Sequence, residues 1–425
     1  MRFLKIIYND SLIKNFFYLM STNVFNIILG FFFWIIVARY YTPNEVGTTS
    51  AILSSMSLIS MISTLGFQTA FIFYLPRERI NANRIINSCM TSSIIASLVF
   101  SFIFILGINI WVPALKFIFK DLEFVILFAA VTTITTISGH ISSAFIAGRR
   151  SSFHMTKEML FGFFKIVPLQ VFSVFGAIGI FMAWGVGVII AVIIGFFWLS
   201  FVWKGYLPSL MLDPIIKSMA GYSVGNYLAE IFYTLPRLVL PIMIVNLVSA
   251  ESTGFFYIAM MIGGLLFGIP QSISNSLLAE SSDGGELWLK VKKSIKLNAI
   301  ILFPGILFFV FFGKFVLNIF NPLYAENAST TLLILTIASL PVSINTLFTA
   351  VRNAQKRVSS VVKINAGVAA LTLAFAFPLS RSSGIEGAAF AFLAANSLAA
   401  IVVVYQMKNL VHNETKILLM NANKK

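Results

Sequence analysis

The chain has 425 residues, of which 58% are hydrophobic and only 11% are charged. A soluble domain carries about 25% charged residues, so this composition excludes a soluble globular protein. The formal net charge is +15, but the basic residues are scattered between apolar runs and are not gathered on one surface. We therefore expect no nucleic-acid partner.

Long apolar runs, separated by charged residues or by proline and glycine, predict an all-α polytopic membrane protein with about twelve transmembrane helices. Each run is close to the roughly 20 residues that cross a bilayer, and none alternates as the strands of a membrane β-barrel do. The residues before the first run are too polar for a cleavable signal peptide, so this run is expected to remain as a span. The expected centres are Leu29, Leu58, Phe100, Thr133, Val171, Ile190, Leu228, Ile262, Leu307, Ile337, Ala370 and Ala395.

The positions of lysine and arginine predict the orientation. Cytoplasmic loops collect these residues, and an even number of spans places both termini on one side. Most of the 30 basic residues then fall on the side of the termini. We therefore expect a multi-pass protein of the cell (cytoplasmic) membrane with both termini in the cytoplasm. The main clusters on this side are Arg77/Arg79/Arg84, Arg149/Arg150, Lys290 to Lys296 and Arg352 to Lys363.

Two pairs of short motifs suggest an internal duplication, because the members of each pair lie about half the chain length apart. The pairs are Thr42 to Gly47 with Ser249 to Gly254, and Phe145 to Arg149 with Phe348 to Arg352. A duplicated six-helix unit gives two halves of the same orientation, an arrangement typical of transporters. We predict two six-helix lobes, residues 1–205 and 206–425, around a central cavity.

The segment Val37 to Gly47, followed by Leu65-Gly66-Phe67 and by Tyr74 to Arg77, resembles the N-terminal signature of the polysaccharide flippase family. This family comprises O-antigen and lipid-linked oligosaccharide translocases. Ser252 to Ala259 is similar to the family's motif at the start of the eighth helix. The resemblance covers nearly the whole chain and implies a fold shared with multidrug and toxin extruders. It also implies that an anionic, lipid-linked sugar moves from the inner to the outer leaflet by alternating access.

Two features depart from the family pattern. Members often have an acidic residue beside a cation in the seventh helix, whereas the segment Tyr233 to Leu240 has no acid beside Arg237. Ion coupling through such an acid is therefore in doubt. Twelve spans, rather than fourteen, also argue against the lipid II flippase branch. We expect no cofactor, and leave a coupling proton, a sodium ion or the membrane potential open as the energy source.

Ionisable residues within the spans are the first candidates for a substrate site, because a charge at the bilayer centre costs about 2.5 to 3.5 kcal/mol. Their spacing places four polar residues on one face of the seventh span, and two prolines are expected to interrupt that helix and free backbone groups for a substrate. The four residues are Asn226, Glu230, Tyr233 and Arg237, and the prolines are Pro236 and Pro241.

Lys165 and Arg237 are the expected ligands of a phosphate or pyrophosphate on a polyprenyl carrier, since cations suit phosphate and arginine binds it bidentately. Glu230 could exchange with the substrate or bind a coupling cation. The alternative is structural. Glu230 would then pair with Arg237, or Glu158 with Lys165, only to lower the cost of insertion.

Sugar recognition requires uncharged hydrogen-bonding side chains within the spans. Such polar residues also form hydrogen bonds between membrane helices, and His140 could either carry a proton or be a buried structural residue. The candidates for the cavity wall are Asn23, Asn26, Gln68, His140, Gln271, Asn275 and Asn345.

An enzyme is not expected, because the sequence has no Asp-x-Asp pair, no P-loop and no dinucleotide fingerprint, and a single cysteine, Cys89, precludes a cysteine-rich metal site. We expect a monomeric flippase whose partners are a lipid-linked glycan, membrane lipids and glycan-assembly enzymes. The alternative is a multidrug or cation extruder of the same fold. A cavity for cations should be net negative, whereas Lys165, Arg237 and Glu230 together leave it positive.

Overall fold

The structure is a computed structural model that describes residues 11–281 and 287–422. The two ends of the chain, predicted to be cytoplasmic, lie outside these residues. Within them, every regular element is helical. The chain forms two compact units, which are described separately. Unit 1 comprises Met1–Ile231 and Pro241–Gly254, and unit 2 comprises Phe232–Leu240 and Phe255–Lys425.

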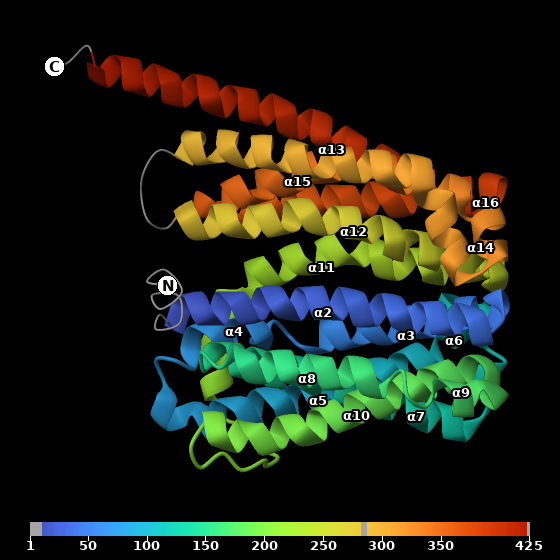
Figure 1. Cartoon of the computed structure of the whole chain (residues 1–425). Coiled ribbons are helices and arrows are strands. Elements are labelled where there is room, and N and C mark those ends of the chain that lie inside the picture. Colours follow the sequence, from blue (N-terminus) through green and yellow to red (C-terminus); the bar gives the residue numbers. More distant parts are fainter. Residues whose placement is uncertain (1–10, 282–286, 423–425) are drawn as a thin grey trace, which may run out of the picture. The chain divides into compact units, whose positions relative to one another are not determined.

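Unit 1 is a bundle of helices that run side by side (Figure 1). Its main helices are α2 (Ser11–Tyr40), α3 (Pro43–Ser63), α4 (Phe67–Tyr74), α5 (Ala82–Leu106), α7 (Leu122–Ala147), α8 (Ser151–Phe164) and α10 (Gly176–Val202). Helix α7 packs against α3, α4, α5, α8 and α10, and α2 packs against α8. The small and hydroxyl-bearing residues of α7 are largely buried, which lets five neighbours approach one helix.

The fifth span was predicted to be centred on Val171, but the corresponding long helix, α8, lies earlier in the chain. Helix α8 ends at Phe164, and the chain then turns before the short helix α9 (Leu169–Phe172). The reason is Pro168, whose ring clashes with the carbonyl four residues earlier and which has no N–H to donate. That carbonyl belongs to Phe164, the last residue of α8. The fifth span is therefore a broken helix.

Unit 2 contains most of α12 (Ala250–Ser281) and the helices α13 (Leu287–Phe320), α14 (Pro322–Asn327), α15 (Ser329–Ala354) and α16 (Val358–Ala422). Helix α15 packs against both α13 and α16. The α16 segment consists of two helices, because Ser383 and Gly384 leave the helical conformation and Gly384 has a φ of +58°. Glycine adopts this left-handed region without the steric cost of a Cβ.

Ten helical segments among the described residues are long and apolar enough to span a membrane. One of them, Val358–Lys408, includes the break at Ser383 and Gly384 and therefore contains two spans. Helix α8, with 14 residues, is shorter than the segments counted as spans, and α9 belongs to the counted segment Leu169–Val202. The protein is a multi-pass, all-α membrane protein, and the prediction of about twelve spans agrees with these helices.

Helix α11 (Ile215–Leu247) is continuous through Pro236 and Pro241. The prediction that the two prolines interrupt this helix is therefore wrong. Membrane helices tolerate proline because neighbouring side chains and small local adjustments satisfy the freed carbonyls. The two compact units divide within α11, whereas the lobe boundary predicted from the sequence, at residue 205, stays a prediction.

The paired motifs of the suggested duplication begin two helices in the same way. Thr42 caps α3, because its Oγ1 accepts a hydrogen bond of 3.3 Å from Glu45 N. Ser249 precedes α12, and its Oγ accepts one of 3.0 Å from Ser252 N. The hydroxyl and the amide are three residues apart in both motifs, which is the spacing of an N-cap.

The glycines that end the two motifs bring the starts of α3 and α12 into backbone contact within unit 1. A Cβ on Gly47 would overlap the carbonyl oxygen of Ala250, and a Cβ on Gly254 would overlap that of Pro43. The contact is reciprocal, since each glycine meets the first residue of the other helix. A contact in which residue i of one element meets residue j of the other, and the reverse, is typical of two elements related by a two-fold axis. A parallel duplication predicts such an axis.

We expect Gly47→Ala to destabilise the protein, because the added methyl group forces apart two backbones that are already in contact. Overpacking of this kind costs about 1–3 kcal/mol. Thermal unfolding in detergent, followed by size-exclusion chromatography, should show a lower midpoint. Gly264→Ala on α12 is the control, because nothing lies within 4 Å of its Cβ position. Equal midpoints for the two variants would contradict the close contact.

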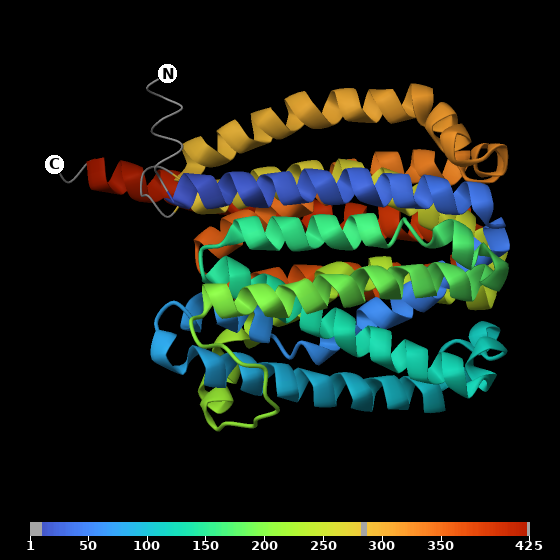
Figure 2. The ribbon, with the colours of Figure 1, turned by 60° about the horizontal axis from the view of Figure 1, so that its bottom comes forward.

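The segment 203–214, which joins α10 to α11, is attached along the start of α5 (Figure 2). Asn83 Nδ2 donates to Gly205 O at 2.7 Å and Asn87 Nδ2 to Leu207 O at 2.8 Å. Arg84 Nε donates to Asp213 Oδ2 at 2.9 Å. Arg84, a member of one of the basic clusters predicted to be cytoplasmic, thus holds this segment to unit 1.

The Asp213 carboxylate accepts a hydrogen bond from Ile215 N at 3.0 Å. This bond, followed by that from Arg84, holds the pKa of Asp213 below its usual range. Because the pKa is lower in the folded state, the carboxylate contributes to the stability of the folded state at neutral pH. This contribution is lost as the pH falls through that pKa.

We expect Asp213→Asn to accelerate hydrogen–deuterium exchange of segment 203–214 at neutral pH. The difference from wild type should vanish on acidification, because the wild-type carboxyl then becomes neutral as well. Mass spectrometry of the exchanged peptides measures both effects. Asp121→Asn, at an exposed carboxylate of the same unit, should leave exchange unchanged, and a difference that persists in acid would rule out the ion pair as its cause.

Candidate functional site

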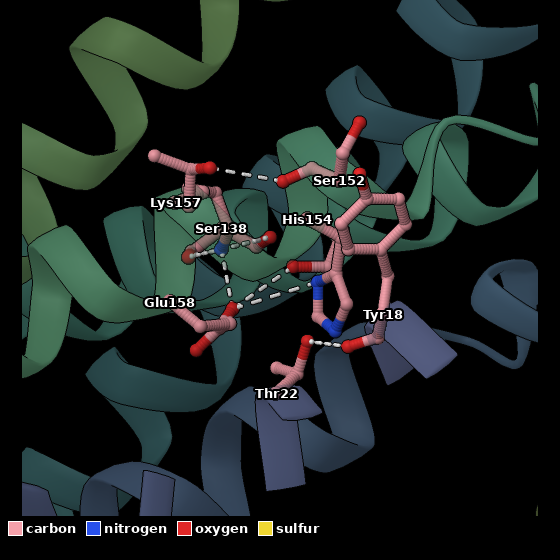
Figure 3. Close-up of polar contacts among 9 residues, drawn as sticks. Tyr18, Thr22, Ser138, Ser152, His154, Lys157 and Glu158 are labelled. Atoms are coloured by element: carbon pink, nitrogen blue, oxygen red, sulfur yellow. Dashed lines mark hydrogen bonds and ion pairs between the residues drawn. The ribbon is translucent and has the colours of Figure 1, made fainter. Parts of the chain in front are cut away.

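A cluster of charged residues lies inside unit 1, where α8 meets α7 (Figure 3). The Lys157 ammonium is 2.8 Å from Glu158 Oε1 and donates to Ser138 Oγ at 2.7 Å. Ser142 Oγ donates to the same carboxylate oxygen at 3.1 Å, and His154 Nδ1 is 3.9 Å from it. The Lys157 side chain is 1% exposed. Its charge is therefore neutralised and its hydrogen-bonding needs are met inside the protein.

This arrangement corrects one of the structural alternatives drawn from the sequence. Glu158 pairs with Lys157 and not with Lys165. Adjacent residues of a helix do not usually face each other, so the pattern favoured Lys165. The long stem of Lys157 instead brings its ammonium group back to Glu158, where α10 has Gly195: a Cβ at this position would lie 3.5 Å from Lys157 Cδ.

We expect Glu158→Gln to destabilise the protein, because it leaves the Lys157 ammonium buried without a counter-charge. Breaking a buried ion pair by removing one partner costs about 3–5 kcal/mol. The double variant Lys157→Met/Glu158→Gln should recover part of the loss, since no unpaired charge remains. The thermal unfolding midpoint in detergent measures both, with Glu123→Gln, at an exposed carboxylate, as the control. A double variant less stable than Glu158→Gln would contradict this explanation.

Lys165 lies at the end of α8, only 6% exposed. Its ammonium lies over the rings of Phe33, Phe161 and Trp184, at 4.9, 4.6 and 4.5 Å from their centroids. Cation–π contacts of this kind stabilise a desolvated cation by about 2 kcal/mol or more. The aromatic rings of α2, α8 and α10 thus enclose Lys165, which places it within the helix packing of unit 1.

The other candidates in unit 1 take two kinds of position. His140 is fully buried on α7, with Nε2 2.8 Å from Ser93 Oγ, and Gln68 packs its amide against the backbone of Gly139. Both contacts suit structural roles. Asn23 and Asn26, on α2, have exposed side chains. Unit 1 therefore does not gather its predicted residues into one site.

Unit 2 contains a pocket in which Arg237 meets uncharged polar side chains. The guanidinium lies over the rings of Tyr233 and Phe267, at 5.0 and 5.3 Å, and Nη2 donates to Tyr233 Oη at 3.2 Å. Helices α15 and α16 form the facing walls. The pocket is lined by Phe232, Tyr233, Pro236, Arg237, Val342, Asn345, Thr346, Thr349, Asn365, Val368, Phe392 and Asn396.

The lining of this pocket is cationic and rich in hydrogen-bonding groups. It has no carboxylate, and Arg237 makes no ion pair with any described residue. Asn345 Nδ2 donates to Asn396 O at 3.0 Å, and Asn345 Oδ1 is buried without a partner among the described residues. The free volume is about 30 Å³, so the pocket is too small for a whole sugar.

Four candidates lie near Arg237 in the sequence or on the next helix. Asn226 and Glu230, on α11, are exposed. Gln271, on α12, donates from Nε2 to Asn275 Oδ1 at 3.3 Å. None of the four lines the pocket of Arg237. The predicted polar face of α11 thus contributes only Tyr233 and Arg237 to it.

The sequence pattern indicated Arg237 and Asn345 but did not indicate Asn365, Asn396, Thr346 and Thr349. Asn365 and Asn396 are single amides within the apolar runs of the last two spans, and that isolation was the available signal. Periodicity assigns such residues to a helix face. It does not say which helices meet.

Comparison with known sequences identifies one family. The sequence model described as polysaccharide biosynthesis protein matches residues 12–266, which is more than half of the chain. No curated protein matches the chain.

Solved transporters share the fold. An inward-facing multidrug resistance MATE family transporter of the MOP superfamily gives a TM-score of 0.73 at 14% identity, covering 92% of this chain and 96% of its own. The lipid II flippase MurJ, in an inward closed conformation, gives 0.72 at 14% identity, covering 92% and 87%. A MOP superfamily transporter from Pyrococcus furiosus gives 0.59 at 13% identity, covering 94% and 93%. The fold implied by the motif Val37 to Gly47 is thereby confirmed.

Proposed function

The chain belongs to the polysaccharide biosynthesis protein family, and from this premise we propose that it is a flippase for a lipid-linked glycan. The proposed substrate is an oligosaccharide or polysaccharide repeat unit on a polyprenyl phosphate. The direction is from the inner to the outer leaflet of the cytoplasmic membrane, by alternating access, with both termini in the cytoplasm. The known transporters of this fold include a lipid II flippase and multidrug transporters, so transport rather than catalysis is the shared activity.

The observation that supports this substrate class is the pocket of Arg237. An arginine without an acidic partner in a membrane-embedded pocket favours an anion, and its planar donors match phosphate oxygens. The guanidinium lies 5.0 and 5.3 Å from the ring centroids of Tyr233 and Phe267, and a ligand in the pocket could accept hydrogen bonds from its N–H groups. Because the pocket has room for one small group, we propose that it binds the phosphate, while the glycan and the lipid tail remain outside it.

The surrounding amides fit the adjoining part of such a head group. Asn345 and Asn396 are buried within hydrogen-bonding distance of each other, and Thr346 and Thr349 lie on the same helix as Asn345. Amide and hydroxyl groups can donate to and accept from sugar hydroxyls. The combination of one cation with neutral polar groups thus suits a phosphorylated sugar.

A multidrug or cation extruder of the same fold is the second candidate, favoured by the likeness to multidrug transporters. Its cation would require a carboxylate in the binding pocket. None lines the pocket of Arg237, so the flippase is the function that the described geometry supports best.

We expect Arg237→Ala to reduce transport of a polyprenyl-phosphate-linked glycan at least tenfold, and Arg237→Lys to retain part of it. Alanine removes the cation, whereas lysine keeps the charge but loses the bidentate geometry. Transport is measured in proteoliposomes, from the access of an external lectin or glycosidase to labelled substrate loaded in the inner leaflet.

Arg381→Ala is the matched control. Arg381 also stacks on an aromatic ring of unit 2, with 4.4 Å between Cζ and the centroid of Phe377, but it does not line the pocket. This variant should transport normally. Wild-type transport by a well-folded Arg237→Ala would exclude the proposed site. Efflux of a cationic dye that is unaffected by Arg237→Ala, together with absent glycan transport by the wild type, would favour the extruder.

A further inference from the structure

Unit 2 has a second concave surface, an apolar groove between α13, α15 and α16. Its free volume is about 820 Å³, far more than that of the Arg237 pocket. Ile295, Ile344 and Val404 of its wall are exposed by 48%, 39% and 41%, so the groove opens on the surface of a helix bundle that lies in a membrane. Its full lining is Trp288, Val291, Lys292, Ile295, Asn298, Ala299, Leu302, Phe303, Leu340, Ser343, Ile344, Leu347, Phe348, Val403, Val404, Met407 and Lys408.

The charges of this groove are all positive and lie at one end. Lys292 is near the start of α13, and Lys408 is at the end of the last membrane span. No acidic residue lines the groove. Lysines at the end of spanning helices lie at the level of the lipid head groups. The groove therefore offers an apolar channel below two cations, which matches a lipid with an anionic head group.

The length of the groove agrees with the depth of one leaflet. From Trp288 to Phe303 along α13 the rise is about 22 Å, at about 1.5 Å per residue. One leaflet contributes about half of a hydrocarbon core of about 30 Å, and the head-group region lies beyond it. A lipid whose phosphate lies at Lys292 and Lys408 would extend its chain to the level of Phe303.

We propose that this groove binds an anionic phospholipid of the leaflet at which α13 begins, with the phosphate between Lys292 and Lys408. With the orientation predicted from charge, this is the cytoplasmic leaflet. The site is separate from that of the transported glycan, because the two use different residues of α15. Leu340, Ser343, Ile344, Leu347 and Phe348 line the groove, whereas Val342, Asn345, Thr346 and Thr349 line the pocket of Arg237.

The test uses the purified full chain in phosphatidylcholine nanodiscs that contain a small fraction of brominated phosphatidylglycerol or brominated phosphatidylcholine. Bromine on the acyl chain quenches nearby tryptophan. The chain has 6 tryptophans, so the signal of Trp288 is taken as the difference between wild type and Trp288→Phe. We expect at least threefold stronger quenching of this signal by the anionic lipid than by the neutral one.

Paired variants, each examined with its own Trp288→Phe counterpart, show whether the lipid preference depends on the lysines that line the groove or on any lysine of α13. Lys292→Gln/Lys408→Gln should abolish the preference for the anionic lipid. Lys293→Gln/Lys296→Gln removes two lysines of α13 that do not line the groove and should preserve it. Ala299→Phe fills the groove and should weaken quenching by both lipids. Monodisperse elution on size-exclusion chromatography confirms that each variant is folded.

Equal quenching by the two lipids in the wild type, or loss of the preference in Lys293→Gln/Lys296→Gln as well, would overturn the proposal. So would displacement of the brominated lipid by polyprenyl phosphate but not by phosphatidylglycerol, which would make the groove part of the substrate path. Arg237→Ala should leave the lipid preference unchanged, so failure of the glycan site and failure of the lipid site give different results.

Discussion

The cost of a charge in a hydrocarbon environment is the constraint on which the interior of this protein depends. Three described cations meet this cost in different ways. Lys157 is neutralised by Glu158, Lys165 is enclosed by three aromatic rings, and Arg237 is stacked on two rings with a single hydroxyl contact. Arg237 combines its charge with a pocket in which Asn345 Oδ1 is buried without a partner among the described residues. This difference separates a residue that stabilises the bundle from one that can bind a ligand.

The two concave surfaces of unit 2 differ in their charges and polar groups, and we therefore propose different roles for them. One is narrow, has several amide and hydroxyl side chains in its wall and contains a cation without a carboxylate, so it suits a phosphate group. The other is wide and apolar and has lysines only at one end. Helix α15 contributes to both, with different residues. One membrane helix can thus contribute to recognition of a transported head group and to binding of a resident lipid.

Backbone contact at two glycines provides a second constraint. Gly47 and Gly254 allow the first turns of α3 and α12 to touch, and each turn is capped by a hydroxyl three residues before an amide. Motifs that looked like features of two separate halves are therefore parts of one contact. The family motif at Thr42 to Gly47 has a physical basis in this contact, which explains why it indicates the fold rather than the substrate.

The sequence by itself determined the membrane class, the approximate helices and the family, because hydrophobic length and local motifs are properties of contiguous residues. It also identified Arg237, Lys165 and Asn345 as unusual residues for a bilayer. The tertiary structure decided that Glu158 pairs with Lys157, that Pro168 rather than Pro236 breaks a helix, and that Asn365 and Asn396 join Arg237 while Asn226, Glu230, Gln271 and Asn275 do not. These outcomes depend on which helix faces meet, and that is set by packing between segments far apart in the chain.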